Sequence, residues 1–583
     1  MPDALATNEA AQAADEAMRR VYLAISTGES FVLEAGAGAG KTHSLINVLQ
    51  HLIATRGGEL LRHQQRVACI TYTNVAKDEI DARTDRDQAV YCDTIHGFCW
   101  TLIKEFQPQM RKRLPEIEKW TEKLKDVGEL GGRTIQYSLG HRSVGVDSVS
   151  IHHDDVISLF LYLVGFPKFR SILVARFPLL LVDEYQDMNN EFAEAIKTHF
   201  LGANEQFLIG FFGDHWQKIY PNVCGKIEHP ALTVINKGAN FRSVKAVVDV
   251  LNRMRPELTQ MVADADAAGS VGVYHTNDWM GKRLSGSQWK GDLPPDAKQR
   301  YVAAAKDVLI SDGWTFDPVS TKILMLTHKA LAVEQRYERL AGVFEYNSSY
   351  VDKEDPHIKY FAEVLEPLCA AYQERHFGQM FGFLGSKVPL TRNSAEKRQW
   401  AASMDKLLSV RESGTVGDVI DHLLHTRHPL LPEDLQEMEY ARRLADDSPE
   451  IEATPAVATL RALRDVPYGE VINLVRYLDG HTPFSTKHGV KGAEFENVLV
   501  IVGMGWNRYN FNQMLELAGK STPIPKDKQD AFERARNLFY VCCSRPRRRL
   551  AVLFTQELSA QAQATLGLWF GAASVHSLGD LQS

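Results

Sequence analysis

The stretch from residue 35 to residue 42 has the composition and spacing of a phosphate-binding loop. It consists of Ala35, Gly36, Ala37, Gly38, Ala39, Gly40, Lys41 and Thr42. An apolar run at 31–33 precedes it, and a helical pattern of apolar residues follows it. Glycines let the backbone approach an anion closely, and the N–H groups that open a helix point at it. The pattern predicts that Lys41 reaches the β- and γ-phosphates of a nucleotide and that Thr42 ligates Mg²⁺.

Two adjacent carboxylates, Asp183 and Glu184, follow the apolar run at 179–182. Acidic side chains at the end of a buried strand are costly unless they serve a cation. With a phosphate loop upstream, we expect Asp183 to hold Mg²⁺ and Glu184 to orient and deprotonate the attacking water. The run at 207–212 leads to Gly213, Asp214 and Gln217, a place where a side chain can sense the γ-phosphate.

Short, continuously apolar runs are the elements that must position these groups. They lie at 31–33, 67–70, 179–182, 207–212, 323–326, 498–502 and 550–554. Continuous rather than alternating hydrophobicity is typical of strands buried on both faces, as in parallel sheets. Because helical patterns fall between the runs, the fold class is α/β.

The runs form two groups, which predicts two parallel-sheet domains. The first is expected to span 1–106 and 166–235, with an insertion at 107–165 that includes a possible hairpin at 137–151. The second is expected to span 236–345 and 475–583, with a helical insertion at 346–474. We predict a mainly helical insertion in each domain.

Composition narrows the class of protein. The chain has 583 residues, of which 44% are hydrophobic and 24% charged, as in ordinary globular proteins. No apolar run reaches the length of a membrane span, and the seven scattered cysteines form no C-x-x-C pair. We therefore expect a cytoplasmic protein with reduced thiols and no membrane partner. The net charge of −7 does not point to nucleic acid, although a local basic groove would suffice for phosphate contacts.

Further motifs, taken in order, resemble those of the UvrD/Rep/PcrA family of superfamily 1 DNA helicases. Besides the loop at 35–42 and the acidic box at 183–187, they are ITYTN at 70–74, DTIHGF at 93–98, NFRS at 240–243, HGVKGAEF at 488–495 and LFYVCCSR at 538–545. The match extends over nearly the whole chain, and the ordered set is specific where no single motif would be. The resemblance implies two RecA-like P-loop domains.

The resemblance also implies roles for individual residues. Gln12 would read the adenine edge, Phe241 would stack on the adenine, and Glu494 would bond the ribose hydroxyls. Gln217, Arg242 and Arg545 would reach the γ-phosphate, the two arginines acting as arginine fingers do. The residues implied to face single-stranded or tailed duplex DNA are Tyr72, His96, Phe98 and His488. Together they imply an ATP-driven 3′ to 5′ translocase and helicase.

The sequence departs from the family pattern at two informative places. His43 stands where the family has an arginine beside the adenine, and Asn222 stands where it often has a base-stacking tryptophan. These departures leave a second function open, a regulatory subunit that binds ATP and DNA and gates a partner such as a nuclease in a defence or repair complex. A P-loop kinase or transporter ATPase fits Arg242 and Arg545 poorly. RNA as the track stays open on residues alone.

A cluster of histidines and aspartates at 152–155 has the residue types of a metal site. We interpret it instead as a helix start, with Asp154 or Asp155 capping a helix that begins at Val156. No further ligand with suitable spacing accompanies the cluster.

Overall fold

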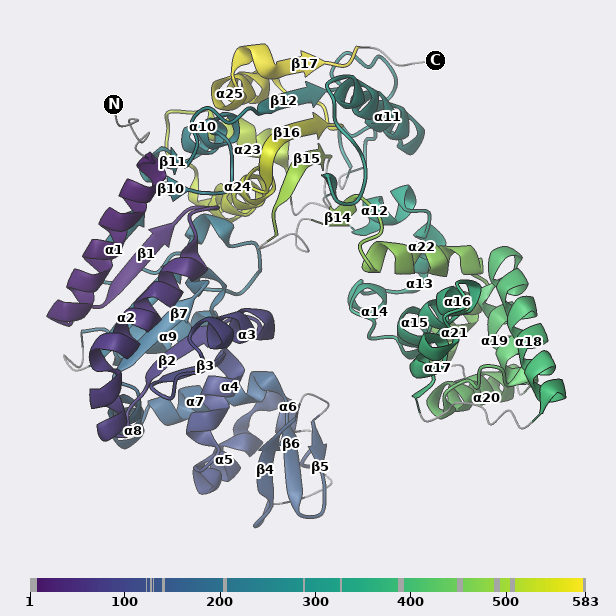
Figure 1. The fold of residues 1–583 in the computed structure, drawn as a ribbon, viewed down its shortest axis with the longest axis horizontal. Coiled ribbons are helices and arrows are strands. Elements are labelled where there is room, and N and C mark those ends of the chain that lie inside the picture. The colour runs from purple at the N-terminus through teal and green to yellow at the C-terminus, as the bar shows by residue number, and fades with distance from the viewer. Residues whose placement is uncertain are drawn as a thin grey trace. The chain divides into compact units, whose positions relative to one another are not determined.

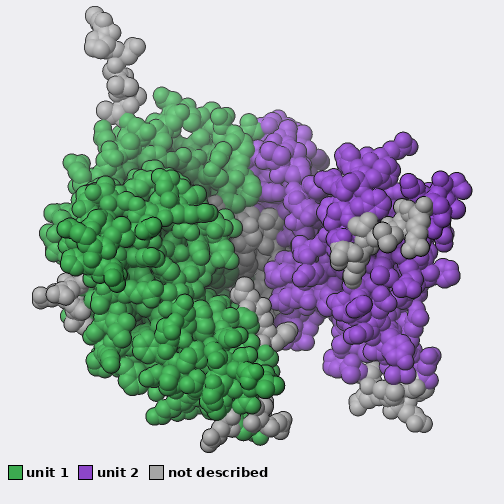
Figure 2. Space-filling model, turned by 60° about the horizontal axis from the view of Figure 1, so that its bottom comes forward, with its two compact units in different colours: residues 1–293, 492–496, 506–583 green, residues 294–491, 497–505 purple. Residues whose placement is uncertain are grey.

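A computed structural model describes residues 8–121, 123–125, 128, 130–138, 142–202, 207–286, 289–325, 328–385, 393–447, 454–486, 493–503 and 509–579. The chain forms two compact units, coloured green and purple in Figure 2. Unit 1 contains residues 1–293, 492–496 and 506–583, and unit 2 contains residues 294–491 and 497–505.

The first part of unit 1 is a six-stranded parallel sheet in the order β3-β2-β7-β8-β1-β9. Its strands are β1 (Phe31–Ala35), β2 (Val67–Thr71), β3 (Val90–Thr94), β7 (Leu179–Asp183), β8 (Leu208–Gly213) and β9 (Thr233–Lys237). Its helices are α1 (Glu9–Thr27), α2 (Lys41–Arg62), α3 (Asn74–Arg83), α4 (Ile95–Ile103), α8 (Pro167–Arg176) and α9 (Asn190–His199). Figure 1 shows α1 and α2 alongside β1.

Continuous hydrophobicity in these strands follows from burial on both faces of the sheet. Every residue of β1 is buried, and successive side chains enter different hydrophobic clusters. Phe31 and Leu33 join the cluster that includes Leu45 of α2, whereas Val32 joins the one that includes Phe98 of α4. A strand with helices packed on both sides has no face left for polar residues, which is why its sequence does not alternate.

Segment 107–165 has more helical than strand residues, and it also contains three short strands. It contains α5 (Gln107–Arg113), α6 (Glu118–Thr121), β4 (Thr134–Tyr137), β5 (Ser143–Val144), β6 (Ser148–Ile151) and α7 (His153–Val164). The predicted hairpin is present as antiparallel β5 and β6, and β4 adds to β6 in parallel. Trp120 of this segment is fully buried in the same cluster as Val32 and Phe211. The segment therefore shares the core of the first sheet.

The remainder of unit 1 comes from two distant parts of the chain. It contains β10 (Ala239–Asn240), α10 (Lys245–Met254), β11 (Met261–Val262), β12 (Ser270–His275), α23 (Phe511–Ala518), α24 (Gln529–Cys543), β16 (Pro546–Phe554), α25 (Ala560–Phe570) and β17 (Val575–Ser577). Strand β12 pairs in parallel with both β16 and β17.

Two single-turn elements carry site residues, η2 (Tyr185–Asp187) and η3 (His215–Gln217).

Unit 2 is mostly helical, and the expected helical insertion at 346–474 lies within it. Its helices are α11 (Pro295–Ser311), α12 (His328–Glu334), α13 (Glu338–Val343), α14 (Ser348–Val351), α15 (Pro356–Tyr360), α16 (Glu366–Gln373), α17 (Phe377–Phe383), α18 (Ser394–Ser413), α19 (Val416–Thr426), α20 (Glu433–Asp447), α21 (Pro455–Arg464) and α22 (Tyr468–Leu478). Strand β13 (Thr321–Met325) pairs in parallel with β14 (Phe484–Thr486) and with β15 (Phe495–Val502), which belongs to this unit from residue 497 onward.

The predicted α/β fold with parallel sheets is confirmed. The compact units group residues 236–293 and 506–583 with the first sheet, whereas the predicted domain limits remain a prediction. Asn240 and Asn537, which lie in these two ranges, donate hydrogen bonds to the backbone carbonyls of Ala37 and Lys218. Among the described helices, no single one is long and apolar enough to cross a membrane.

Candidate nucleotide-hydrolysis site

The phosphate-binding loop has the strand–loop–helix geometry that the sequence predicts. Strand β1 ends at Ala35 and helix α2 begins at Lys41. Gly38 and Gly40 have φ values of 77° and 71°, in the left-handed region that glycine adopts without strain. The loop thus turns back over the opening of α2, where backbone N–H groups and the helix dipole favour an anion. Lys41 Nζ lies 3.5 Å from the Ala35 carbonyl oxygen.

The NFRS segment packs directly on this loop. Asn240 Nδ2 donates to the Ala37 carbonyl at 3.0 Å, and the Phe241 backbone N–H donates to the Gly38 carbonyl at 2.9 Å. A Cβ at Gly38 would lie 2.7 Å from Asn240 Oδ1 and 2.9 Å from Arg242 Cβ. Glycine at 38 is therefore required by the close approach as well as by its φ. The contact places Phe241 and Arg242 beside the loop.

The acidic pair at the end of β7 has the properties of a cation site. Asp183 is 5% exposed, and its Oδ1 accepts a hydrogen bond from the Glu184 backbone N–H at 3.1 Å. Burial and the charge of Glu184 raise the pKa of Asp183 to about 7. Lys41 opposes this shift only in part. A buried carboxylate with its pKa raised in this way is stabilised in its charged form by a nearby cation.

Glu184 is held in an unusual backbone conformation. Its φ is 47°, in the left-handed region that residues with a Cβ rarely adopt. Gln186 Nε2 donates to Glu184 Oε2 at 2.5 Å, so a neutral amide fixes the direction of the carboxylate. Backbone strain of this kind costs about 1–3 kcal/mol and is found where side-chain direction matters.

Gln217 and Arg545 meet in the interior of unit 1. Arg545 Nη2 donates to Gln217 Oε1 at 3.1 Å, and both side chains are buried. Burial, reinforced by the neighbouring Arg242, lowers the pKa of Arg545 to about 10. Tyr540, on the helix α24 that precedes Arg545, lies close to the Ala37 backbone of the phosphate loop. Arg545, Gln217 and the phosphate loop therefore belong to one site.

Arg242 and Glu494, predicted to contact the γ-phosphate and the ribose, contact each other. Arg242 Nε lies 2.9 Å from Glu494 Oε2, and Arg242 Nη1 donates to the Ser544 carbonyl at 3.1 Å. Arg547 makes a second ion pair with Glu494. Burial opposes ionisation of Glu494, but hydrogen bonds from Arg547 and Arg242 outweigh it and lower the pKa of its carboxyl.

The residues expected to hold the adenine line the rim of the loop. Gln12 on α1 and His43 on α2 are exposed, and the Phe241 ring is 47% exposed. The ring nitrogen Nδ1 of His43 lies 3.0 Å from Arg83 Nη2. Burial, together with the charges of Arg83 and Lys237, lowers the pKa of His43. A guanidinium from α3 is thus close to the place where His43 replaces the arginine of the family pattern.

The sequence analysis missed Lys237, at the end of β9. Its Nζ donates to Ser44 Oγ at 2.7 Å and to the Gly40 carbonyl at 3.4 Å. Burial and the nearby charge of Lys41 lower its pKa to about 8. Strand β9 pairs in parallel with β1, and Lys237 lies opposite Ala35, the first residue of the loop. A prediction that residues 233–237 form the strand next to β1 would have placed a side chain near the loop.

The predicted nucleic-acid contacts have different environments. Tyr72 is 49% exposed and stacks on Tyr220 with ring centroids 6.0 Å apart. His96 is half-buried, and burial together with His153 lowers its pKa to about 4. Phe98 is 1% exposed and packs against Tyr91 and Phe177, so it is a core residue and a nucleic-acid contact at Phe98 is wrong. His488 lies outside the described residues.

A cavity of about 820 Å³ links these contacts to the acidic pair. Tyr72 and His96 contribute to its wall on one side, and Asp183 and Glu184 on the other. Asn222, the departure noted in the sequence, also lines it. Tyr72 and His96, the predicted DNA contacts, therefore line the same cavity as Asp183 and Glu184, the residues predicted to carry out hydrolysis.

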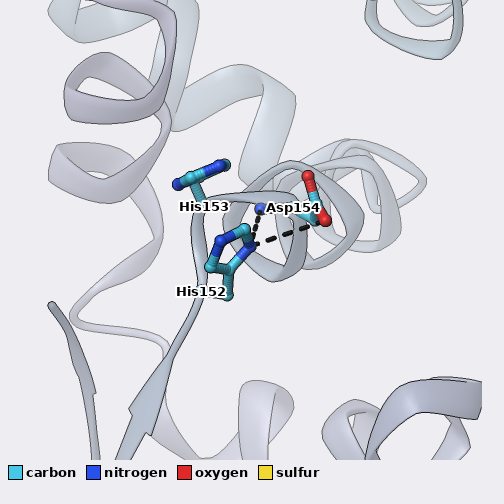
Figure 3. A group of neighbouring side chains, drawn as sticks. All are labelled: His152, His153 and Asp154. Carbon is cyan, nitrogen blue, oxygen red and sulfur yellow. Dashed lines mark hydrogen bonds and ion pairs between the residues drawn. The ribbon is translucent and has the colours of Figure 1, made fainter. Parts of the chain in front are cut away.

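The cluster at 152–155 is a helix start, as interpreted, although its details differ. Helix α7 begins at His153, and His152 is the N-cap in a capping box with Asp155. Asp155 also pairs with Arg142 at 2.8 Å, and Asp154 pairs with Lys119 at 3.1 Å. Figure 3 shows the interactions between His152 and Asp154, with none drawn to His153. The helix N-terminus and two basic partners make this a poor place for a cation.

Comparison with known proteins agrees with this geometry. A family model described as an AAA domain matches residues 19–222. The chain is 21% identical to Gabija protein GajB of Bacillus cereus (strain HuB5-5), over an alignment that covers 93% of this chain and 96% of that protein. It is 28% identical to the ATP-dependent DNA helicase Rep of Escherichia coli (strain K12), over 39% of this chain and 41% of that protein. The Rep helicase of Salmonella typhimurium matches to the same extent, at 28% identity. The nucleotide site and these similarities support an ATP-dependent enzyme that resembles UvrD/Rep-like superfamily 1 helicases.

Proposed function

We propose that the protein is an ATP-driven 3′ to 5′ translocase and helicase on single-stranded DNA, in which hydrolysis is coupled to closure of two RecA-like domains. The observation that carries the proposal is the hydrogen bond between Gln217 and Arg545, which are 328 residues apart in the chain. It joins the single turn η3, which follows β8 of the phosphate-loop sheet, to a residue that lies between α24 and β16. A γ-phosphate between them would be sensed from both sides at once.

Each residue then has a role in hydrolysis. The loop and Lys41 bind the β- and γ-phosphates, and Glu184 orients and deprotonates the attacking water. Thr42 and Asp183 would hold Mg²⁺, which when bound neutralises charge on the phosphate oxygens. Arg545 and Arg242 stabilise the charge that develops on the transferred group.

Nucleotide binding requires two side chains to change partners. Arg242 and Glu494 are paired with each other, so we expect ATP to draw Arg242 to the γ-phosphate and release Glu494 to the ribose. His43, Gln12 and Phe241 would contact the adenine. Tyr72, His96 and His488 would contact the DNA strand, since stacking on bases is independent of sequence. We also propose that the protein works in the cytoplasm, where its seven free cysteines stay reduced.

The proposal is tested by ATPase and strand-displacement assays on the intact chain. We expect single-stranded DNA to stimulate ATP hydrolysis, Lys41→Ala to abolish turnover, and Glu184→Gln to reduce it at least about 100-fold. Lys245→Ala, which changes an exposed residue of α10, is the matched control. Displacement from a duplex with a 3′ tail and not from one with a 5′ tail would establish the direction. Absence of any stimulation by single-stranded DNA would contradict the motor.

A second candidate function is a regulatory subunit that uses ATP and DNA binding to gate a partner such as a nuclease. It is supported by the nearly full-length match to the Gabija protein, whereas the Rep helicases match over only 39% of the chain. Asn222 at the cavity wall, in place of a stacking aromatic, points the same way. DNA-stimulated hydrolysis without displacement from either tailed duplex would favour this function over the helicase.

A further inference from the structure

Beside the nucleotide contacts lies a buried ionic cluster that no step of the mechanism above uses. Arg255, just after α10, is 2% exposed. Its Nη1 lies 2.5 Å from Asp214 Oδ1 and its Nη2 lies 3.4 Å from Glu34 Oε2, and both carboxylates are buried. Glu34, Asp214 and His215 together have the ligand types of a metal site, but the guanidinium occupies the position between the carboxylates. The cation of this cluster is therefore Arg255.

Asp214 connects this cation to the residues of hydrolysis in two directions. Its Oδ2 accepts a hydrogen bond from Gln217 Nε2 at 2.8 Å. Its backbone N–H donates to Gln186 Oε1 at 3.0 Å, and Gln186 Nε2 in turn donates to Glu184 Oε2 at 2.5 Å. One aspartate thus fixes the amide that faces Arg545 and, through a second amide, the carboxylate predicted to activate water.

Helix α24 also contacts η3, the single turn that carries Gln217. Two guanidinium groups lie near the Trp216 ring, with Arg536 3.9 Å and Arg255 5.3 Å from its centroid. Asn537 Nδ2 donates to the backbone carbonyls of His215 and Lys218, each at 3.2 Å. The single turn η3 has few backbone hydrogen bonds of its own, so these contacts determine where it lies.

We propose that Arg255 is a positioning residue for ATP hydrolysis, acting through Asp214 to hold Gln217 against Arg545 and Glu184 toward the water. Arg255 neutralises Asp214 in the interior, where an unpaired carboxylate would be protonated or would draw in water. Either change weakens the hydrogen bond to Gln217, because a neutral carboxyl is a weaker acceptor than a carboxylate and a water competes for it. The residues that bind the phosphates, Lys41 and the loop backbone, keep their contacts without Arg255. The inference rests on the proposed role of Glu184.

The test compares Arg255→Met with Arg253→Met, an exposed arginine in the last turn of α10, two residues before Arg255. Because a displacement of about 1 Å can cost about 100-fold in rate, we expect Arg255→Met to lower kcat about 10- to 100-fold. We expect KM for ATP and the affinity for N-methylanthraniloyl-ATP to change by less than about 3-fold. Arg253→Met should match the unsubstituted protein. An Arg255→Met protein that is folded and keeps kcat within about 2-fold would overturn the proposal.

Two further variants keep the test decisive if Arg255→Met unfolds. Arg255→Lys keeps the charge but loses the guanidinium fork, and we expect an intermediate kcat. The double variant Asp214→Asn with Arg255→Met removes both buried charges and is expected to restore thermal stability. A carboxamide in place of the Asp214 carboxylate cannot serve both the Trp216 N–H and Gln217 with one oxygen, so we expect kcat to stay low. A double variant with full kcat would show that Arg255 serves stability alone.

The proposed function fails separately from this inference. If Glu184→Gln retains turnover, the role of Glu184 is wrong whatever Arg255 does. If Glu184→Gln is inactive and the folded Arg255→Met protein is fully active, only the positioning role is wrong.

Discussion

The guanidinium of Arg545 donates a 3.1 Å hydrogen bond to the amide oxygen of Gln217, and both side chains are buried. Gln217 follows the phosphate-loop sheet in sequence, whereas Arg545 follows α24 near the end of the chain. Gln217 Nε2 also donates to Asp214, and Arg545 Nε also donates to the Val541 carbonyl, so both side chains are held in place by further hydrogen bonds. The site is therefore complete only when the segments around Gln217 and Arg545 are folded together.

Loss of the arginine should therefore affect turnover more than binding. We expect Arg545→Ala to lower kcat by about 1,000-fold or more, the range of other arginine fingers, with little change in nucleotide affinity. Arg548→Ala, an exposed residue paired with Glu496, is the control. Steady-state ATPase rates and fluorescent nucleotide binding measure the two effects. An equal loss in affinity and kcat would place Arg545 in ground-state binding instead.

Arg83 should contribute to nucleotide selectivity. Its Nη2 lies 3.0 Å from the His43 ring, where it supplies a guanidinium beside the expected adenine. We expect Arg83→Ala to raise KM for ATP about 3- to 10-fold, the value of about one exposed cation–π contact or slightly more, and to narrow the preference for ATP over CTP. Arg62→Ala, at the far end of α2, is the control. Unchanged KM for both nucleotides would exclude a role for Arg83.

Lys237 predicts a pH dependence of nucleotide binding. Burial and Lys41 lower its pKa to about 8, and Asp15 is the acidic group that opposes the shift. Because bound phosphates favour the charged ammonium, we expect ATP affinity to fall by up to about 10-fold as pH rises from about 7 to 9. Lys237→Met should bind more weakly at pH 7 and lose this dependence, and Lys245→Met should retain it. Fluorescent nucleotide titrations across this range provide the measurement.

The same lysine predicts the sign of a stability effect. The pKa of Lys237 is lower in the folded protein than the ordinary value of lysine, so above pH 8 the unfolded chain binds more protons than the folded one. The free energy of unfolding therefore gains a term that increases with pH between about 8 and 10.5. Lys237→Met should lack this increase in urea denaturation. An identical slope in the variant would show that Lys237 is charged throughout.

Trp120 tests whether segment 107–165 shares the core of the first sheet. The side chain is fully buried in a cluster that also contains Val32 and Phe211. We expect Trp120→Ala to reduce the free energy of unfolding by about 3–5 kcal/mol in one cooperative transition with the sheet. Val146→Ala, in the same segment but 86% exposed, should change it by less than about 0.5 kcal/mol. Separate unfolding of the segment would indicate an independent core.

The sequence predicted the strands and the phosphate loop well because both depend on local pattern. A strand buried on both faces is continuously apolar, and a glycine-rich turn at the start of a helix forms an anion site from consecutive residues. Lys237 and Arg255 were not predicted, since a buried cation is identified by its partners, which lie 193 and 41 residues away in the chain. Phe98 was misassigned for a related reason: an aromatic residue has the same place in a motif whether it faces the core or the solvent.

The start of α7 shows a smaller limit of the same kind. Aspartate is a common N-cap, so Asp154 and Asp155 were the natural candidates. The helix begins earlier than predicted, at His153, so His152 is the N-cap and Asp155 is the N3 residue of the capping box, where it also pairs with Arg142.

Gly38 has a consequence beyond the shape of the loop. Its carbonyl accepts from the Phe241 backbone N–H, and its α-carbon leaves no room for a methyl group next to Asn240. A displacement of the loop when a nucleotide enters or leaves would therefore reach the adenine-facing ring through main-chain atoms alone, without a rotamer change. No substitution at Asn240 can compensate for a side chain at 38, because the φ of 77° would remain. Transmission of a loop displacement to Phe241 would therefore depend on the absence of a side chain at residue 38.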